Sequence, residues 1–386
     1  MTPARLLLID DAFPMNRGGS FAGWKHAEFT GLLQSIPEAV SVCPPQSFTG
    51  ARDLEGFLRD RDLLLRSNPA LNPEKVTYSE NLGELRGDLA YCVFPHYAHR
   101  LLPWLERSRL PFTFTIFPGG GFLMWGAGQA ASDNRLRALF TSKFFAGVFV
   151  HHAIIQRYLN TKHGLTDRVF FLKGGFSQMD ASLIRPKTYY GFERDVMNVC
   201  FVANRYDPIG LGKGYDVFIN AAKSLASLRP HCRFHVVGDW SRDIIDVSDI
   251  GDRIRFHGYL AIDALAQLYS EMDAIVSPTR IDVPREGKFD GFPLVIDAGM
   301  CGVAMFVSDP LGQNEDFVPG EELEIIRPEP DDVVERLLPY CSEPARLRDM
   351  SIRGQQRISQ VRNKEEKLAA KAAILKKLMM ARCSAS

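Results

Sequence analysis

The stretch KFDGFPLVIDAGMCG, residues 288–302, predicts both ends of a short helix in the second half of the chain. Pro293 suits the first helical position, because a backbone N–H at that position would lack an intrahelical partner anyway. Gly302 suits the position just after a helix ends. Asp290 therefore falls in the loop before the helix, and Asp297 falls about one turn inside it.

A helix start with carboxylates on both sides allows two interpretations. The N–H groups of Leu294 and Val295 have no intrahelical partner, so they can receive a phosphate or sugar oxygen. Asp297 can then accept hydrogen bonds from a pair of hydroxyls. The alternative is a helix N-terminus that acidic residues merely stabilise through the helix dipole.

The residues around this helix alternate between short apolar runs and segments with helical periodicity, which predicts a parallel sheet covered by helices. The predicted strands of the second half are 196–203, 232–238, 253–259, 273–279, 303–309 and 323–326, and the predicted helices are 214–228, 262–272, 293–300 and 331–340. The first half repeats the pattern less clearly, with strands 5–10, 89–95, 112–118, 145–150 and 168–175 and helices 22–33, 99–108 and 154–164. Residues 51–75 are charged and irregular, and no element is assigned to them.

The length of the chain predicts two domains, and the alternation of strands and helices predicts that both are α/β in class. The chain has 386 residues, which is too long for one ordinary core. The expected domains are 1–188 and 189–386, with 363–382 a candidate helix that either packs back on the first domain or lies on anionic lipid. A ligand site is expected beyond the carboxyl ends of the strands, in a cleft between the domains.

Charge and cysteine usage narrow the function classes. Lys+Arg and Asp+Glu both number 46, so no basic excess favours a nucleic-acid partner. The seven cysteines are scattered singly without a CxxC pair, so neither a disulfide framework nor a zinc site is expected and a reducing cytoplasm fits better. The first apolar run, 6–9, is too short for a signal peptide, and no segment reaches the length of a membrane span. Any membrane contact would be peripheral.

Two glycine-rich loops offer sites for a phosphorylated ligand. NRYDPIGLGKGYD (204–216) follows a predicted strand, and Arg205 and Lys213 bracket its glycines. Fixed positive charge next to a closely approaching backbone suits a diphosphate. NRGGSFAGW (16–24) follows the first strand and brings Gly18 and Gly19 to a helix start. Neither loop has P-loop or GxGxxG spacing, and each could be an ordinary turn.

The order of these landmarks resembles one known family. VVGD (236–239), FHGYL (256–260), LAQLYSEMDAIVSPTR (265–280), DGFPLVIDAGMCG (290–302) and VSDPLGQNEDF (307–317) follow the Arg205 loop in the order found in GT-B glycosyltransferases of the retaining family 4, glycosyl transferases group 1. The resemblance covers about 120 residues of the second half and is looser in the first half. It implies two Rossmann-like domains facing each other across a cleft, with an acceptor-side domain first and a nucleotide-sugar donor domain second.

The resemblance also implies roles for individual residues. Arg205 and Lys213 would hold the diphosphate together with Gly18 and Gly19, Asp297 would bind the ribose hydroxyls, and Asp290 would face the transferred sugar. The remaining positions expected to contact the nucleotide sugar are Gly238, Tyr259, Glu286, Gly291, Phe292, Pro293 and Leu294. No cofactor or metal is expected, because the nucleotide sugar is itself a substrate.

Two departures from the family pattern affect the residues expected to contact the transferred sugar. The paired acids are both aspartate, where glutamate is usual, and their spacing is one residue shorter, so Glu286 is an alternative to Asp290. A family histidine after the third strand is replaced by Phe117-Pro118. The metal-binding pattern of a different glycosyltransferase class, Asp60-Arg61-Asp62, lies in a segment that is predicted to be helical, and His151-His152 are interpreted as core or interdomain residues.

The resemblance thus implies a retaining hexosyl- or deoxyhexosyltransferase, and the cysteine usage fits a cytoplasmic protein. Its expected partners are a nucleotide-diphosphate sugar and a glycan or lipid-linked acceptor, as in polysaccharide or glycoconjugate biosynthesis. The alternatives are a nucleotide-sugar binding protein without turnover and a sugar-nucleotide epimerase on the same fold. A phosphorylase and a Rossmann dehydrogenase are less well supported, because no feature requires pyridoxal phosphate and no GxGxxG follows a strand.

Overall fold

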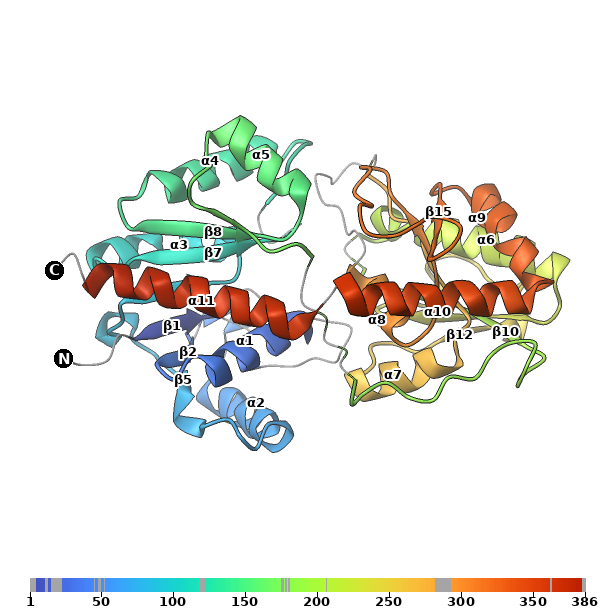
Figure 1. Ribbon diagram of the computed structural model, residues 1–386, viewed down its shortest axis with the longest axis horizontal. Helices are drawn as coiled ribbons and strands as arrows, with labels where there is room; N and C mark the ends of the chain where they lie inside the picture. The colour runs from blue at the N-terminus through green and yellow to red at the C-terminus, as the bar shows by residue number, and fades with distance from the viewer. Residues whose placement is uncertain are drawn as a thin grey trace. The chain divides into compact units, whose positions relative to one another are not determined.

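A computed structural model gives the structure of most of the chain, which divides into two compact units (Figure 1). The structure describes residues 5–10, 13–14, 23–44, 46–47, 50–51, 53–117, 122–174, 177, 179, 181–205, 207–281, 293–361 and 363–383. Of these, the residues up to Gly174 (Gly23 apart) and Lys364–Cys383 form unit 1, and the residues from Ser177 to Asn363 form unit 2.

Unit 2 is built on a parallel six-stranded sheet. From edge to edge its strands are β12 (Ile254–Phe256), β11 (Cys232–Val237), β10 (Met197–Val202), β13 (Ala274–Ser277), β14 (Ala304–Ser308) and β15 (Glu324–Ile326). Its helices are α6 (Tyr215–Leu228), α7 (Ile262–Glu271), α8 (Pro293–Met300), α9 (Pro330–Leu337) and α10 (Pro344–Val361), with short 3₁₀ turns η3 (Leu211–Lys213), η4 (Gly251–Arg253) and η5 (Leu338–Cys341). The predicted alternation of strands and helices is confirmed.

Both faces of this sheet are covered, which explains why its central strands are mostly apolar instead of alternating. Every residue of β10 is buried. Met197, Val199 and Phe201 face a core shared with α6, α9 and the start of α10, whereas Cys200 and Val202 face a second core shared with α7 and α8. The central strand is therefore fixed from two sides, and the loop that follows it has a rigid base.

The strand order of unit 2 reverses between β10 and β13. The chain runs outward from β10 to β11 and β12, then returns to β13 and continues outward on the other side. The loops that leave β10 and β13 thus diverge at the carboxyl edge of the sheet. In open α/β sheets this reversal point is where ligands bind.

Unit 1 has a parallel seven-stranded sheet of similar construction. Its strand order is β5 (Val76–Tyr78), β2 (Ala39–Cys43), β1 (Leu6–Ile9), β6 (Leu89–Cys92), β7 (Phe112–Ile116), β8 (Phe145–Val150) and β9 (Val169–Phe171). Its helices are α1 (Gly23–Ser35), α2 (Leu54–Ser67), α3 (Pro95–Arg107), α4 (Gln129–Thr141), α5 (Ala153–His163) and α11 (Lys364–Cys383), with turns η1 (Pro73–Lys75) and η2 (Leu82–Glu84) and a small antiparallel pair, β3 (Gln46–Ser47) and β4 (Gly50–Ala51). The α/β class is confirmed for both units.

The last helix, α11, completes the core of unit 1. Ala372, Leu375 and Met379 on this helix are buried against residues of α1, α2 and the sheet. The side chain of Lys371 is also fully buried, and its Nζ lies 2.7 Å from Oε1 of Glu28 on α1. The helix is therefore attached to the unit by an internal ion pair as well as by apolar contacts.

Hydrogen bonds to strand residues surround that ion pair. Nζ of Lys371 donates to the hydroxyls of Tyr91 at 2.6 Å and Thr115 at 3.0 Å, and the Tyr91 hydroxyl also donates to Glu28. Burial lowers the pKa of Lys371, while the charge of Glu28 raises it. A buried charge is tolerated only when paired and hydrogen-bonded in this way.

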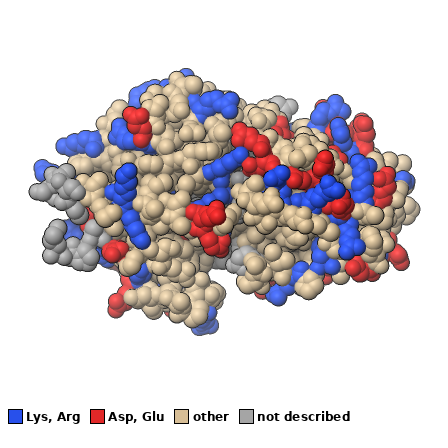
Figure 2. Space-filling model, in the orientation of Figure 1, with Lys and Arg blue, Asp and Glu red and all other residues tan. Residues whose placement is uncertain are grey.

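The surface carries charges of both signs. Lys and Arg side chains are interspersed with Asp and Glu over the face seen in Figure 2, as expected for a chain with a formal net charge of zero. Among the helices of the described residues, none is both long and apolar enough to cross a membrane.

Candidate functional site

The loops after β10 and β13 are in direct contact at the reversal point of the unit 2 sheet. A Cβ placed on Gly214 would lie 2.0 Å from the carbonyl oxygen of Pro278, and Gly214 has a φ of +69°. The backbone N–H of Arg280 donates to the carbonyl of Gly212 at 3.1 Å, and the Arg280 guanidinium pairs with Asp216 on α6 at 2.9 Å. Glycine at 214 is therefore required both by conformation and by space.

We predict that Gly214→Ala lowers the stability of unit 2 and distorts the loop that carries Lys213. An alanine at positive φ costs about 1–2 kcal/mol by itself, and the contact with Pro278 adds to this cost. The matched control is Gly258→Ala, which has a similar φ of +65° but no atom within 4 Å of the added Cβ. Urea unfolding of both variants measures the difference, and equal losses would contradict a steric role for the Pro278 contact.

Three side chains from neighbouring strand ends gather at this edge. Arg205, after β10, pairs with Asp239, after β11, at 2.9 Å, and its guanidinium also donates to the carbonyl of Pro208 at 3.2 Å. Tyr259 follows β12 and is exposed. Partial burial and the charge of Asp239 raise the pKa of Tyr259, whereas Arg205 lowers it, so the three groups share one electrostatic environment. The guanidinium is 30% exposed and can reach a ligand.

The glycine loop between Arg205 and Lys213 is organised by a residue that the sequence interpretation did not single out. The Asp207 carboxylate accepts hydrogen bonds from the backbone N–H groups of Ile209 and Gly210, and from those of Leu211 at 3.0 Å and Gly212 at 3.4 Å. These amides are used within the loop. Positive charge for an anionic ligand therefore comes from side chains at this loop.

Lys213 ends the 3₁₀ turn η3 immediately before α6. Its residue is only 6% exposed, because the loop folds over the sheet edge at this point. The chain thus places one partly exposed cation, Arg205, and one buried cation, Lys213, on either side of Asp207 in the sequence. The loop between the two cations is fixed by the hydrogen bonds of Asp207.

The base of the site is rigid. A Cβ on Gly238 would lie 2.1 Å from the carbonyl oxygen of Ala203, so the chain ends of β10 and β11 are in close approach. Nε1 of Trp240 donates to the same carbonyl at 2.7 Å, and the Trp240 ring stacks on Tyr215 with centroids 4.4 Å apart. The absence of a side chain at Gly238 therefore lets the ends of β10 and β11 approach each other, with the Trp240 indole bonded to the Ala203 carbonyl.

Asp297 lies within α8, which begins at Pro293 as predicted. The residue is 5% exposed, and its carboxylate accepts a hydrogen bond from the hydroxyl of Ser177, at the start of unit 2. Ser177 is fixed in turn by Met179, whose N–H donates to the hydroxyl at 3.0 Å. Sequence reasoning missed Ser177 because 120 positions separate the two residues and no local pattern marks the contact.

Several predicted site residues lie outside the described residues. These are Gly18, Gly19, Glu286, Asp290, Gly291 and Phe292. For Pro293 and Leu294 the structure describes the helical backbone but not the side chains. The structure brings Arg205 and Tyr259 together and places Lys213, Gly238 and Asp297 on the loops and helices around the same sheet.

A pair of histidines beneath this edge makes stability depend on pH. Nδ1 of His235 lies 3.1 Å from Nε2 of His257, and burial, assisted by the charge of His257, lowers the pKa of His235 to about 4. Between that value and the unfolded pKa of about 6.5 the unfolded chain binds a proton that the folded protein does not. The stability conferred by neutral His235 is therefore complete above the unfolded pKa and is lost as pH falls.

We predict that unit 2 loses about 2 kcal/mol of stability from this residue between pH 7 and pH 5. His235→Gln should flatten the pH dependence over that range, because glutamine does not titrate. Urea unfolding at both pH values, with the wild type and the variant, measures the slope. An unchanged slope in the variant would mean that other groups cause it.

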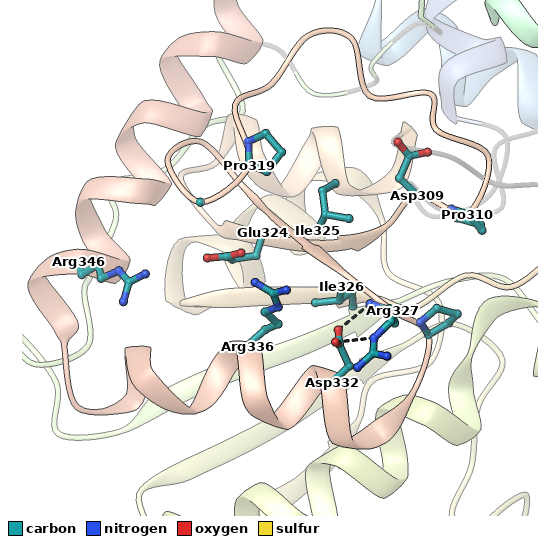
Figure 3. A pocket seen from close by; sticks show the side chains of 12 residues that line it. Asp309, Pro310, Pro319, Glu324, Ile325, Ile326, Arg327, Asp332, Arg336 and Arg346 are labelled. Atoms are coloured by element: carbon teal, nitrogen blue, oxygen red, sulfur yellow. Dashed lines mark hydrogen bonds and ion pairs between the residues drawn. The ribbon is translucent and has the colours of Figure 1, made fainter.

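A separate cavity of about 610 Å³ opens beside β15 and α9 (Figure 3). Its carboxylates have internal partners. Asp332 bonds Arg327 at 2.8 Å, Glu324 accepts from the Tyr340 hydroxyl at 2.5 Å, and Asp309 accepts the N–H groups of Gln313 and Asn314. Arg336 reaches from α9 toward Glu324 (Figure 3). The cavity lies at the outer edge of the sheet and contains none of the predicted site residues.

Other sequence candidates occupy structural positions. Asp60-Arg61-Asp62 lies in the middle of the helix α2 and not at the end of a strand. His151 is buried, its Nδ1 lies 2.7 Å from the Leu172 carbonyl, and its ring stacks on Phe117 with centroids 4.6 Å apart. Burial holds the pKa of His151 well below its usual range. It is therefore a neutral core residue.

Comparison with known proteins connects this geometry to a family. Residues 197–342 match the family model of glycosyl transferases group 1. The matched segment contains Arg205, Lys213, Gly238, Tyr259 and Asp297, and it spans the reversal point of the unit 2 sheet. Comparison with curated proteins gives no match.

Solved structures show the same fold over nearly the whole chain. Sucrose-phosphate synthase from Thermosynechococcus elongatus is 16% identical, with a TM-score of 0.68 and coverage of 98% of this chain and 100% of that one. HepE of Anabaena, solved with UDP and glucose, is 16% identical, with a TM-score of 0.69 and coverage of 97% and 100%. A putative UDP-N-acetylglucosamine 2-epimerase from Listeria monocytogenes is 11% identical, with a TM-score of 0.59 and coverage of 96% and 95%. The predicted GT-B fold is confirmed.

Proposed function

We propose that the protein is a retaining glycosyltransferase of family 4. It transfers a hexosyl or deoxyhexosyl group from a nucleoside-diphosphate sugar to a hydroxyl of a glycan or lipid-linked acceptor. The observation that carries the proposal is the position of Arg205 and Lys213 at the reversal point of a parallel sheet, within the segment that matches the group 1 glycosyltransferases. HepE, which has the same fold, was solved with UDP and with UDP-glucose.

In the proposed reaction the acceptor oxygen forms a bond to the anomeric carbon while the bond to the diphosphate oxygen breaks. Attack occurs on the same face as the leaving group, and the departing phosphate accepts the proton of the hydroxyl. Negative charge grows on the diphosphate in the transition state. Arg205 and Lys213 stabilise that charge, and their fixed positions avoid the cost of reorienting dipoles during the reaction.

The other proposed contacts with the nucleotide sugar come from residues just after the strands and at the start of α8. The exposed Tyr259 ring and the backbone at Gly238 lie beside Arg205 and would contact the nucleotide. The N–H groups at the start of α8 would receive an oxygen of the donor, and Asp297, inside the same helix, would contact the ribose. No metal takes part in this scheme, because the two cations neutralise the diphosphate.

The test is a thermal-shift measurement with UDP, GDP, ADP, CMP and dTDP, each with and without magnesium. A ligand that binds only the folded protein raises the melting temperature by mass action. We expect one nucleoside diphosphate to raise it, with no further effect of magnesium. The corresponding nucleotide sugar is then supplied with acceptors, and release of the nucleoside diphosphate is measured.

Three results would contradict the proposal. No shift with any nucleotide would exclude the donor site, and a shift that requires magnesium would exclude the metal-independent scheme. Conversion of the nucleotide sugar to an isomer without any acceptor would identify an epimerase instead. Binding of a nucleotide sugar without its consumption by any acceptor would leave the binding-protein alternative as the better description.

A further inference from the structure

A histidine and two cysteines converge at the amino end of the unit 2 sheet. His231 and Cys232 lie at the start of β11, and Cys341 lies at the end of η5. One ligand atom from each of the three lies within 4.8 Å of the others. Both thiols are buried, and His231 is partly exposed. The sequence did not predict this cluster, because 109 positions separate the two cysteines.

The separation of the two sulfur atoms matches that of a metal-bound pair. The Sγ atoms of Cys232 and Cys341 are 3.8 Å apart. Two Zn–S bonds of about 2.3 Å at the tetrahedral angle place their sulfur atoms about 3.8 Å apart. A disulfide would require a separation of about 2.05 Å. The sulfur atoms are thus already spaced for a bridging cation and would have to move to bond each other.

Tyr190 orients the imidazole of His231. The Tyr190 hydroxyl lies 3.0 Å from Nε2 of His231 and donates to the Cys341 carbonyl at 2.8 Å. The Tyr190 and His231 rings are stacked with centroids 5.3 Å apart and an angle of 8°. Metal-bound histidines are commonly oriented by such a hydrogen bond. Tyr190 therefore links two of the three candidate ligands and limits their movement.

The donor set of the cluster suits a soft cation. His231 and Cys232 belong to the segment RPHCR (229–233), in which arginines flank both ligands. Two thiolates and one neutral imidazole form a soft donor set with two negative charges, which a divalent d¹⁰ cation neutralises. Hard cations such as Mg²⁺ prefer oxygen ligands and do not suit this set.

We propose that His231, Cys232 and Cys341 bind one Zn²⁺ ion. The ion displaces the two thiol protons, and the partly exposed side of His231 leaves a fourth position for water. The site lies at the amino end of β11, whereas Gly238 and Asp239 lie at its carboxyl end. Six strand residues, or about 20 Å, separate the two edges. The zinc ion would therefore connect β11 to η5 at a position away from the proposed glycosyl-transfer site.

The test measures metal binding by the intact, fully reduced protein. We expect one zinc ion per chain after zinc loading and removal of excess metal, measured by elemental analysis. Cobalt(II) should give a thiolate-to-metal absorption band in the near ultraviolet, and zinc should abolish it. Zinc affinity, measured by competition with a chelating dye, should fall at least about tenfold in Cys232→Ser and in Cys341→Ser. The control Cys92→Ser removes a buried thiol of unit 1 and should bind zinc normally.

The cobalt measurement on the wild-type protein keeps the test decisive even where a variant folds poorly. Absence of the thiolate band in the reduced wild-type protein would overturn the proposal. So would unchanged zinc affinity in both folded serine variants, because the metal would then be bound elsewhere. Binding of copper(I) without binding of zinc would also contradict it.

Discussion

Replacement of Lys371 by methionine is expected to lower the free energy of unfolding of unit 1 by about 3–5 kcal/mol. The substitution keeps the length of the side chain but removes its charge, so the carboxylate of Glu28 is left in the core without its cation. The side chains of both residues are fully buried, so water cannot compensate. At the usual scale for units of this size the melting temperature falls by roughly 10 °C.

A double-mutant cycle separates the ion pair from its surroundings. The combined variant Lys371→Met and Glu28→Leu should regain most of the loss, because no uncompensated charge stays in the core. The Tyr91 and Thr115 hydroxyls keep each other as partners at 2.7 Å. Lys377→Met, on the exposed side of α11, is the matched control and should change stability little. A double variant as unstable as the single one would show that the loss comes from packing and not from charge.

The second large effect concerns turnover. Arg205→Ala and Lys213→Met are each expected to lower kcat by about 10²–10³-fold, the usual loss when one preorganised charge-stabilising group is removed. The ion pair between Arg205 and Asp239 is partly exposed, and such pairs contribute little to stability. Arg205→Ala should therefore fold normally and bind the nucleoside diphosphate more weakly.

The measurement compares kcat and KM for the donor with the melting temperature of each variant. Arg255→Ala, an exposed arginine on β12, is the control and should retain full activity. A near-normal kcat in both site variants would contradict the assignment of these cations to the diphosphate. A large fall in melting temperature for Arg205→Ala would mean that its role is structural.

Most of the fold could be predicted because the strands of both sheets are apolar runs of the expected length. The start and end of α8 could be predicted from local signals alone, because Pro293 marks its first residue and Gly302 follows its end. Weaker signals failed elsewhere. The short edge strand β5 and the second strand β2 were not predicted, and α2, in the charged region 51–75, could not be placed. Only Phe57 and Leu64 of α2 are buried, too few for a clear apolar stripe.

Within the candidate site, too, the sequence could place residues marked by local signals but not residues that depend on long-range contacts. Arg205, Lys213 and Gly238 follow strands directly, so the sequence could place them at one edge of the sheet. Asp207 escaped notice because its function is to accept backbone N–H groups, and an aspartate before a glycine turn has no distinct signature. Ser177 and the His231, Cys232 and Cys341 cluster depend on contacts between distant segments, which periodicity cannot reveal.

The buried pair of Glu28 and Lys371 has a consequence for the synthesis of the chain. The ribosome releases α1 and the seven strands of unit 1 first, then all of residues 177–363, and only then the helix that carries Lys371. Most of unit 2 lies in the continuous segment from Ser177 to Asn363, which is made before α11. The Glu28 carboxylate in the core of unit 1 has no cation until the helix that carries Lys371 has been made. A chain that terminates before residue 371 would therefore have to bury Glu28 without its cation or leave unit 1 unfolded.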